Sequence, residues 1–268
     1  MPEAQPAESR LIVTRDGPTL IMTLSNPSMR NALGPSVYEA MMDVFLQQVP
    51  RDAGIRALVL TGEGGMFCGG GNLTRLRENQ YAPKEVQAKS IDKLHTAVRA
   101  MRACQLPVIA AVEGHAAGAG FSLALNCDMI VAAEDAKFTM SYVKVGLTPD
   151  AGGSYSLTKL LPRQMAAEFM MLGDVIPATR LHSVGVVNSI VPKGASLDAA
   201  MSIAERLADG ASGAQGRVKR LIALAEGQQM QQHLDWEKEA FVESLHSLEA
   251  KEGIAAFLGK RTPNFPRG

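Results

Sequence analysis

Short apolar runs mark out the first half of the chain. These runs span residues 11–14, 20–24, 56–61, 108–112, 129–133 and 137–139. Apolar and β-branched runs of this length, bounded by Gly, Pro, Asn or Asp, predict β-strands. Asp16-Gly17 lies between the first two runs and predicts a hairpin, because this dipeptide suits the positive φ angles of a tight turn.

Helical spacing of apolar residues predicts the other elements. Val37, Met41, Val44 and Phe45 recur three to four residues apart, which predicts a helix over 36–49. Further helices are predicted over 91–104, 119–126, 153–172, 178–184, 196–208, 214–226 and 230–250. Residues 74–90 are polar and have no clear period, and we interpret them as a mobile cover over a nearby pocket.

Two glycine-rich loops each follow a predicted strand. The first spans Met66 to Leu73 and the second spans Gly114 to Phe121. Small residues let a backbone approach a ligand closely, and they leave N–H groups free at a turn or helix start. Two such loops can direct two N–H donors at one oxygen, which would form an oxyanion hole. The alternative is that both loops are only tight structural turns.

Composition limits the classes of function. The chain has 268 residues, of which 46% are hydrophobic and 5% aromatic, enough for one large domain with an aliphatic core. Lys plus Arg and Asp plus Glu both number 27, so the formal net charge is zero. We therefore expect no nucleic-acid partner and no attraction to an anionic membrane. No apolar run reaches the length of about 18 residues that a membrane span needs.

The cysteines and the N-terminal segment suggest a cytoplasmic setting. Cys68, Cys104 and Cys127 have neither metal-ligand spacing nor an even number, so we expect no metal site and a reducing compartment. The first residues are acidic and rich in proline, without the apolar stretch of a secretion signal. The glycines from Gly114 to Gly120 do not have the G-x-G-x-x-G spacing of a dinucleotide site.

At the level of ordered motifs, the chain resembles the crotonase (enoyl-CoA hydratase/isomerase) superfamily from about residue 11 to 265. The matching motifs are Asn31-Ala32-Leu33, residues 67–73, residues 107–128, residues 146–153, and residues 252–257 followed by Lys260-Arg261. The resemblance implies an α/β fold, a spiral of ββα turns rather than a doubly wound sheet. It also implies a helical C-terminal part that forms trimers.

The resemblance divides the chain into three regions. Residues 1–9 are expected to form a disordered lead, residues 10–195 the crotonase core with the acyl-CoA site, and residues 196–268 a helical region for trimerisation and cover. A homotrimer or a hexamer is the expected assembly. The implied substrate is an acyl-CoA thioester, with no separate cofactor because coenzyme A is part of the substrate.

The resemblance also assigns the site. It places the oxyanion N–H groups on Gly71 and Ala119. Arg30 is expected to meet a phosphate of coenzyme A, and Phe257 and Lys260 to flank its adenine from a neighbouring subunit. The other substrate-binding positions that it implies are Ala32, Gly69, Asn72, Leu73 and Tyr142. Asn72 replaces an aspartate of the family whose usual role is local loop bonding.

Two side chains depart from the family pattern. Hydratases that this chain resembles carry glutamates where it has Ser122 and Tyr142. Adding water across a double bond usually requires one group to accept a proton and another to deliver one. Ordinary hydration is therefore hard to assign. Ser122 is interpreted as filling space, and Tyr142 either donates a hydrogen bond to substrate or packs in the wall.

Asp150 is the carboxylate that remains at the site the resemblance implies. Relatives that move a double bond carry an aspartate there, and one carboxylate suits that reaction. Apolar neighbours such as Met140, Val143 and Leu147 would raise its pKa. The alternative is that Asp150 caps the helix that begins near Gly152, and the two roles are compatible.

Three functions follow from these residues. We expect an isomerase that shifts a double bond in an unsaturated acyl-CoA, with Asp150 as the proton shuttle. A second hypothesis is a hydratase or hydrolase that uses an ordered water, and a third is a non-catalytic CoA-thioester binding protein. His115 has the right chemistry for a base at neutral pH, but its small neighbours favour a structural role.

Overall fold

The computed structural model describes residues 8–266. Its strands are β1 (Arg10–Asp16), β2 (Thr19–Ser25), β3 (Ala57–Gly62), β4 (Val108–Val112), β5 (His115–Ala117), β6 (Met129–Ala133), β7 (Lys137–Thr139), β8 (Ile176–Pro177) and β9 (Ser189–Val191). The lead expected over 1–9 falls mostly outside the described residues. Ser9 is described: it is buried, and its carbonyl accepts a hydrogen bond from the Ser36 hydroxyl at 2.6 Å.

The strands form two sheets. A six-stranded sheet has the order β1-β2-β3-β4-β6-β9, and a three-stranded sheet has the order β5-β7-β8. β1 and β2 pair antiparallel from Arg10 opposite Ser25 to Asp16 opposite Thr19, which confirms the predicted hairpin. The other neighbours in the large sheet run parallel. Gly17 has a φ of 53°, the turn conformation for which glycine is suited.

Successive turns of chain stack on one another. β4 and β6 are neighbours in the large sheet, and β5 and β7, which follow them, are neighbours in the small sheet. Isolated parallel bridges between Leu33 and Gly71 and between Cys68 and Ala116 continue this stacking into earlier turns. The chain is therefore a spiral, as the family resemblance implied.

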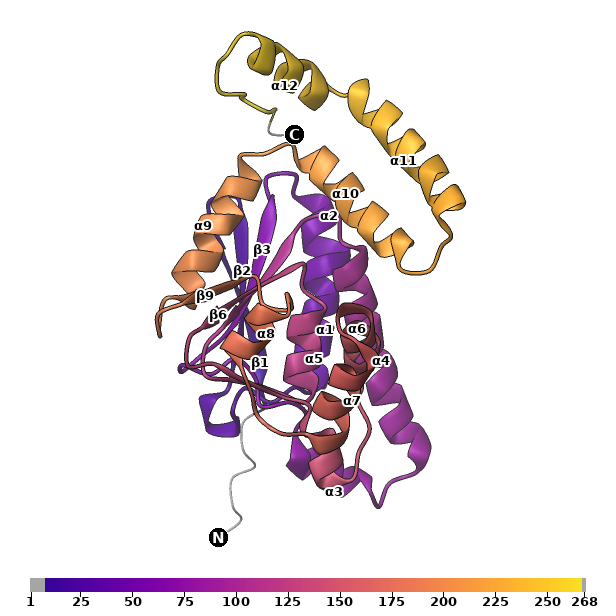
Figure 1. Cartoon of the computed structure of the whole chain (residues 1–268). Coiled ribbons are helices and arrows are strands. Elements are labelled where there is room, and N and C mark those ends of the chain that lie inside the picture. Colours follow the sequence, from indigo (N-terminus) through magenta and orange to yellow (C-terminus); the bar gives the residue numbers. More distant parts are fainter. Residues whose placement is uncertain (1–7, 267–268) are drawn as a thin grey trace.

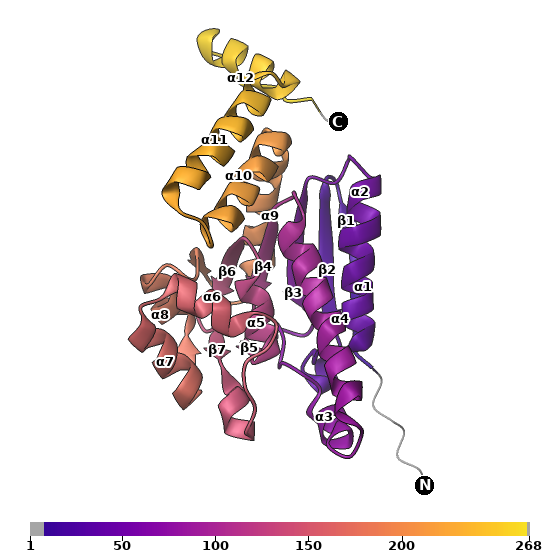
Figure 2. The same cartoon turned by 90° about the vertical axis from the view of Figure 1, so that its right-hand side faces the viewer.

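Helices cover both faces of the large sheet (Figures 1 and 2). The longer helices of the core are α1 (Pro35–Asp43), α4 (Lys84–Ala103), α6 (Gly153–Leu160), α7 (Arg163–Leu172) and α9 (Ser196–Ala208). The shorter ones are η1 (Pro27–Met29), η2 (Val44–Gln48), α2 (Val49–Arg51), α3 (Leu73–Asn79), α5 (Ala119–Leu125), η3 (Ser141–Val145) and α8 (Ala178–Ser183). The parallel strands are therefore buried between helices.

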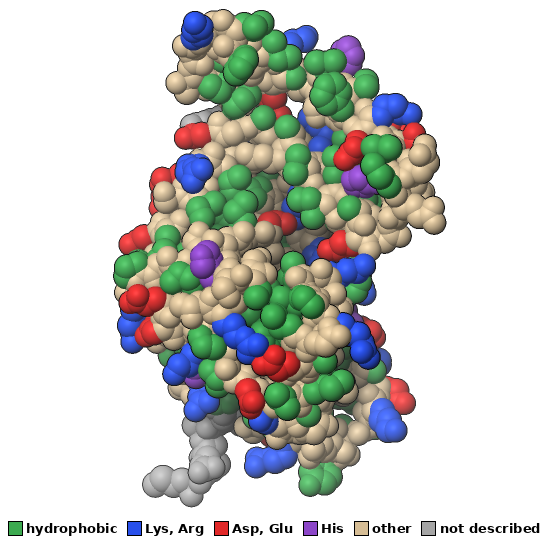
Figure 3. All heavy atoms as spheres, in the orientation of Figure 1, with side chains coloured by type: hydrophobic (Ala, Val, Ile, Leu, Met, Phe, Trp, Pro, Cys, Tyr) green, Lys and Arg blue, Asp and Glu red, His purple; other side chains and the backbone are tan. Residues whose placement is uncertain are grey.

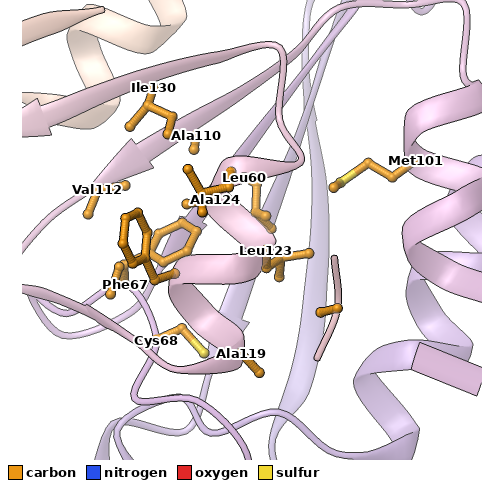
Figure 4. Close-up of a cluster of buried hydrophobic side chains, with 14 of the residues drawn as sticks. Leu60, Phe67, Cys68, Met101, Ala110, Val112, Ala119, Leu123, Ala124 and Ile130 are labelled. Atoms are coloured by element: carbon orange, nitrogen blue, oxygen red, sulfur yellow. The ribbon is translucent and has the colours of Figure 1, made fainter. Parts of the chain in front are cut away.

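Alternate residues of each central strand point to different cores. Leu60 and Ala110 lie in the larger core, which Figure 4 shows gathered around α5. Val59 and Ile109 point the other way and pack against Ala200 of α9. The predicted C-terminal region from residue 196 includes α9, whereas the contacts of this helix join it to the sheet. The proposed division at residue 195 stays a prediction.

Three predicted segments need correction. Residues 74–90, expected as an aperiodic cover, lie mostly in α3 and the first turns of α4. The helix expected over 153–172 is interrupted at Leu161 and Pro162, because proline has no backbone N–H to donate the hydrogen bond that would continue α6. The helix expected over 230–250 ends at Leu245, and Ser247 then caps a new one by accepting from the Ala250 amide.

The last three helices project beyond the core. They are α10 (Ser212–Ala225), α11 (Met230–Leu245) and α12 (Leu248–Leu258). In both cartoon views α11 and α12 stand away from the sheets, with α10 between them and the core. Large apolar side chains on this arm are exposed, for example Phe241 at 68% and Leu248 at 68%, and Figure 3 shows apolar atoms across this end of the molecule. None of the helices over 8–266 is both long and apolar enough to cross a bilayer.

Candidate active site

The two glycine-rich loops lie against each other. The Cys68 amide donates to the His115 carbonyl at 3.0 Å, and the Ala117 amide donates to the Cys68 carbonyl at 2.9 Å. Gly70 has a φ of 101°, and a Cβ there would lie 2.8 Å from the Ala117 carbonyl oxygen and 3.5 Å from the Ala119 nitrogen. The close approach of the loops therefore requires glycine at this position.

Two amides at this contact are available to a ligand. Within residues 8–266, neither the Gly71 N–H nor the Ala119 N–H donates to a protein acceptor. The amide of Gly69 is used, because it donates to the Arg30 carbonyl at 2.7 Å. Ala119 is the first residue of α5, where amides have no partner within the helix. The loops can therefore present two donors to one oxygen, which is what an oxyanion hole requires.

Asn31 holds the first loop in place. It is fully buried, and its side-chain amide donates to the carbonyls of Glu63 at 2.9 Å and Met66 at 2.8 Å. Its side-chain oxygen accepts from the Asn26 amide at 2.9 Å. The neighbouring Leu33 amide donates to the Gly70 carbonyl at 2.7 Å. The Asn31-Ala32-Leu33 motif thus fixes the backbone on either side of the free Gly71 amide.

Asp150 lies at the end of a chain of hydroxyl groups. The Tyr142 hydroxyl donates to Oδ1 of Asp150 at 2.6 Å, and its oxygen lies 3.0 Å from Oγ of Ser122. Ser122 belongs to α5, which begins at Ala119. The three residues that the sequence analysis treated separately are therefore one connected group, and α5 joins this group to the second glycine loop.

The interpretation of Asp150 as a side-chain cap is wrong. The N-cap residue of α6 is Gly152, with a φ of 77°, and no side chain caps this helix. Asn126 holds the loop instead, since its side-chain amide donates to the carbonyls of Ala151 and Ser122 at 2.7 Å each. The Asp150 carboxyl is therefore free of a capping role.

Burial raises the pKa of Asp150, while the Tyr142 hydrogen bond and the charge of His95 act to lower it. Burial and the charge of Asp150 also raise the pKa of Tyr38 to about 12. Tyr38 comes from α1 and His95 from α4, so two helices distant in sequence face the carboxyl. Neither residue was predicted as part of the site, because neither lies in a motif. Helical periodicity on α1 and α4 is the one signal that could have suggested them.

The expected apolar wall around Asp150 is only partly present. Met140 is buried, but Val143 is 43% exposed and Leu147 47% exposed. Tyr142, only 8% exposed, encloses the carboxyl more closely. Tyr142 is therefore both packed in the wall and hydrogen-bonded, and its partner is Asp150.

Other predicted residues surround the glycine loops. Arg30 packs on Gly69, where a Cβ would lie 3.0 Å from the Arg30 Cβ. Burial, followed by the charges of Lys137 and Arg30, lowers the pKa of His115. Asn72 caps α3 by accepting from the Arg75 amide at 3.1 Å, a local bond of the kind expected. Of the two remaining positions, Ala32 is buried and Leu73 is 59% exposed.

The C-terminal residues lie elsewhere on the chain. Phe257, 84% exposed, is near the end of α12, and Lys260 follows that helix with a φ of 52°. In both cartoon views α12 stands at the opposite end of the molecule from α3, which follows the first glycine loop. Within one chain these residues do not join the site, and the contribution expected from a neighbouring subunit stays a prediction.

Comparisons with known proteins agree with this architecture. The model of the enoyl-CoA hydratase/isomerase family matches residues 16–267. The 1,2-epoxyphenylacetyl-CoA isomerase of Escherichia coli (strain K12) is 34% identical over 247 residues, 92% of this chain and 94% of that protein. The 2,3-dehydroadipyl-CoA hydratase of the same strain is 32% identical over 257 residues, 96% of this chain and 98% of that protein.

Solved structures give the same result. An enoyl-CoA hydratase from Polaromonas sp. JS666 superposes with a TM-score of 0.94 at 49% identity, and the match covers 96% of this chain and 100% of that one. A second structure, described as a putative enoyl-CoA hydratase from Streptomyces coelicolor A3(2), gives a TM-score of 0.92 at 30% identity and covers 100% of this chain and 98% of that one. With its motifs, spiral fold and nearly full-length matches, the chain belongs to the enoyl-CoA hydratase/isomerase family of the crotonase superfamily, whose members act on acyl-CoA thioesters.

Proposed function

We propose that the protein is an isomerase that shifts a carbon–carbon double bond in an unsaturated acyl-CoA. The observation that carries this proposal is the carboxylate of Asp150, which is held by the Tyr142 hydroxyl, itself in contact with Ser122. By the family resemblance, these two residues stand where hydratases carry glutamates. An isomerisation needs one group that removes and returns a proton, and Asp150 satisfies that requirement.

The mechanism uses the two free amides and one carboxylate. The thioester oxygen accepts hydrogen bonds from the N–H groups of Gly71 and Ala119. Asp150 removes a proton from a carbon of the acyl chain, and the electron pair moves toward the thioester to give an enolate. The amides stabilise the negative oxygen. The protonated Asp150 then returns the proton two carbons along, so that no atom is gained or lost.

The surroundings of Asp150 suit both halves of this shuttle. Burial raises the pKa of its carboxyl, which makes the carboxylate a stronger base than an exposed aspartate. The conjugate acid still has to release the proton in the second step. A pKa that is raised by burial and restrained by the Tyr142 bond balances the two steps, because efficient acid–base catalysis requires an intermediate pKa.

The relatives inform the substrate class. The 34% identical relative is an isomerase whose name gives an epoxide of phenylacetyl-CoA as substrate. Its similarity supports isomerisation of an acyl-CoA, and it makes cyclic acyl-CoAs as worthwhile to test as linear ones. The other substrate contacts proposed here are those predicted around Arg30, Gly69 and Leu73 on the first loop.

Hydration or hydrolysis through an ordered water is the second candidate. It is supported by His95, whose charge acts on Asp150 and which also lines a cavity of ≈ 550 Å³ between α3 and α4. A second titratable group would supply the extra proton transfer that water addition needs. The 32% identical hydratase also supports this candidate.

A panel of 2-enoyl-, 3-enoyl- and cyclic acyl-CoA esters separates these functions. Isomerisation changes the absorbance of the thioester and leaves its mass unchanged, whereas hydration adds one water and hydrolysis releases free coenzyme A. We expect turnover without a change of mass. A product that contains added water would contradict the isomerase proposal. Binding of these esters without any turnover would leave the third function, a non-catalytic binding protein.

Asp150→Asn tests the proposed base. The substitution keeps the shape of the side chain and removes the proton acceptor, so we expect turnover to fall at least about 100-fold, since general bases contribute roughly 10²–10⁴-fold. Affinity for acyl-CoA should change little. Asp174→Asn is the matched control, because that carboxylate is 70% exposed and pairs with Lys144 on the surface. An Asp150→Asn enzyme with wild-type turnover would exclude Asp150 as the base.

A further inference from the structure

The hydrogen bond from Tyr142 occupies only one oxygen of Asp150. It reaches Oδ1 at 2.6 Å, and no described group donates to Oδ2 from a side chain. The Tyr142 oxygen in turn lies 3.0 Å from Oγ of Ser122. Ser122 is fully buried and Tyr142 is 8% exposed, so solvent does not compete strongly for these bonds.

We propose that Tyr142 is a positioning residue that holds Oδ1 of Asp150 and so leaves Oδ2 as the oxygen that exchanges the proton with substrate, with Ser122 supporting the Tyr142 hydroxyl. This inference rests on the proposed function, since it assigns a task to residues that serve the same carboxylate. It differs from the sequence interpretation, in which Ser122 filled space and Tyr142 faced the substrate or the wall.

The direction of the hydrogen bonds follows from the chemistry. An ionised carboxylate only accepts, so the Tyr142 hydroxyl must donate its single proton to Asp150. The Ser122 hydroxyl then donates to the Tyr142 oxygen. Burial and the nearby Asp150 charge raise the pKa of Tyr142, so it stays protonated and remains a donor through the working pH range. Tyr142 therefore orients the base and does not replace it.

The packing around Ser122 leaves room for this arrangement. Gly153, the first residue of α6, faces Ser122 so closely that a Cβ there would lie 2.1 Å from the Ser122 Oγ and 3.0 Å from its Cβ. The absence of a side chain at Gly153 lets α5 and α6 approach while Ser122 keeps its contact with Tyr142. Gly153, the second glycine after Asp150 in the motif, thus serves the same chain of hydroxyl groups.

The groups that face Asp150 come from three elements. Tyr142 approaches from η3, Tyr38 from α1 and His95 from α4. Arg75 of α3 acts on Tyr38. Among the described groups, the Tyr142 hydroxyl, the charge of His95 and the backbone amide of Asp150 itself lower the pKa of Asp150. Removing the Tyr142 hydroxyl should therefore raise that pKa while the other two stay in place.

The test is Tyr142→Phe in the full-length protein. The pKa of Asp150 is measured by carbon NMR titration of aspartate-labelled protein, with its signal assigned by Asp150→Asn. We expect the midpoint of the Asp150 titration, which gives its pKa, to lie at a higher pH in Tyr142→Phe than in wild type. In kinetics, the acid limb of the pH–rate profile should shift to higher pH, because the base has a higher pKa. The value of kcat should fall roughly 10- to 100-fold with little change in KM, since a hydrogen bond to a charged group contributes that much.

Tyr155→Phe is the matched control. Tyr155 is 46% exposed on α6 and its hydroxyl bonds to Glu226, away from Asp150, so this variant should keep the wild-type midpoint and profile. Ser122→Ala should raise the midpoint less than Tyr142→Phe, and should add nothing in the double variant, because Ser122 acts through Tyr142.

An Asp150 midpoint that is equal in wild type and Tyr142→Phe overturns the proposal, whatever the activity. If Tyr142→Phe does not fold, Ser122→Ala decides in its place, and an unchanged midpoint there also overturns it. Failure of the proposed function gives a different result: Asp150→Asn would then retain turnover, while the shift in midpoint on removing the Tyr142 hydroxyl would persist.

Discussion

Gly120→Ala should disturb the contact between the two glycine loops. A Cβ at residue 120 would lie 2.5 Å from the Cys68 carbonyl oxygen, 2.6 Å from its Cβ and 2.8 Å from its Sγ. Ordinary contacts of a Cβ lie at 3.4–4 Å. One of these atoms belongs to the Cys68 backbone, which cannot rotate away as a side chain can, so the two loops must move apart by on the order of 1 Å. A displacement of that size can lower the rate about 100-fold.

The magnitude for stability follows from the same clash. Inserting a methyl group into a filled core costs about 1–3 kcal/mol. For a chain of this size each kcal/mol lowers the Tm by roughly 2–4 °C, so we expect a decrease of about 2–12 °C. The rate should fall further than stability alone would suggest, because the Gly71 and Ala119 amides would no longer converge on one oxygen.

Thermal denaturation and the isomerisation assay measure the two effects. Gly227→Ala is the control, since a Cβ there meets nothing within 4 Å and the residue follows α10, away from the loops. We expect wild-type Tm and kcat/KM for that variant. Wild-type behaviour of Gly120→Ala would refute the steric argument. A lower Tm with unchanged kcat/KM would refute the link between loop contact and catalysis.

Two further predictions concern stability and assembly. Because the pKa of Asp150 is raised on folding, its contribution to stability is fully present below the unfolded pKa of about 3.9 and is lost as pH rises through the folded pKa. Asp150→Asn should therefore have a higher Tm than wild type at neutral pH and a similar one in acid, and an equal Tm at pH 7 would contradict this. For assembly, Phe241 and Leu245 of α11 are 68% and 45% exposed, so we expect light scattering to show a trimer or hexamer that Phe241→Glu weakens. A wild-type monomer at micromolar concentration would rule this out.

The sequence was most informative where structure depends on local residues. Most strands of the large sheet were predictable because each is a short, largely apolar run, and the hairpin because Asp16-Gly17 suits its turn. The short strands β5, β8 and β9, of two or three residues each, were not predicted, because so few residues carry no recognisable pattern. The glycine loops were predictable for a similar reason, since their backbone conformation and close contacts exclude side chains. Resemblance to a family then supplied the order of the turns, which no local pattern contains.

Contacts between distant segments were beyond the sequence. Tyr38 and His95 reach Asp150 from helices that precede it by many residues, and both also look like ordinary members of amphipathic helices. The bond between Tyr142 and Asp150 depends on how η3 and the following loop fold back. Residues 74–90 were not predicted to be helical, because tertiary packing, rather than apolar periodicity, stabilises α3 and the start of α4.

The position of α9 has a consequence for biosynthesis. One face of the sheet, with Val59, Ile109 and Val131, is covered by α9. β6 ends at Ala133 and α9 ends at Ala208, so during translation at roughly 5–20 residues per second the face stays open for on the order of 4–15 s. The nascent chain therefore exposes this aliphatic face of the sheet until α9 has been synthesised. During this interval, aggregation or binding by a chaperone competes with folding.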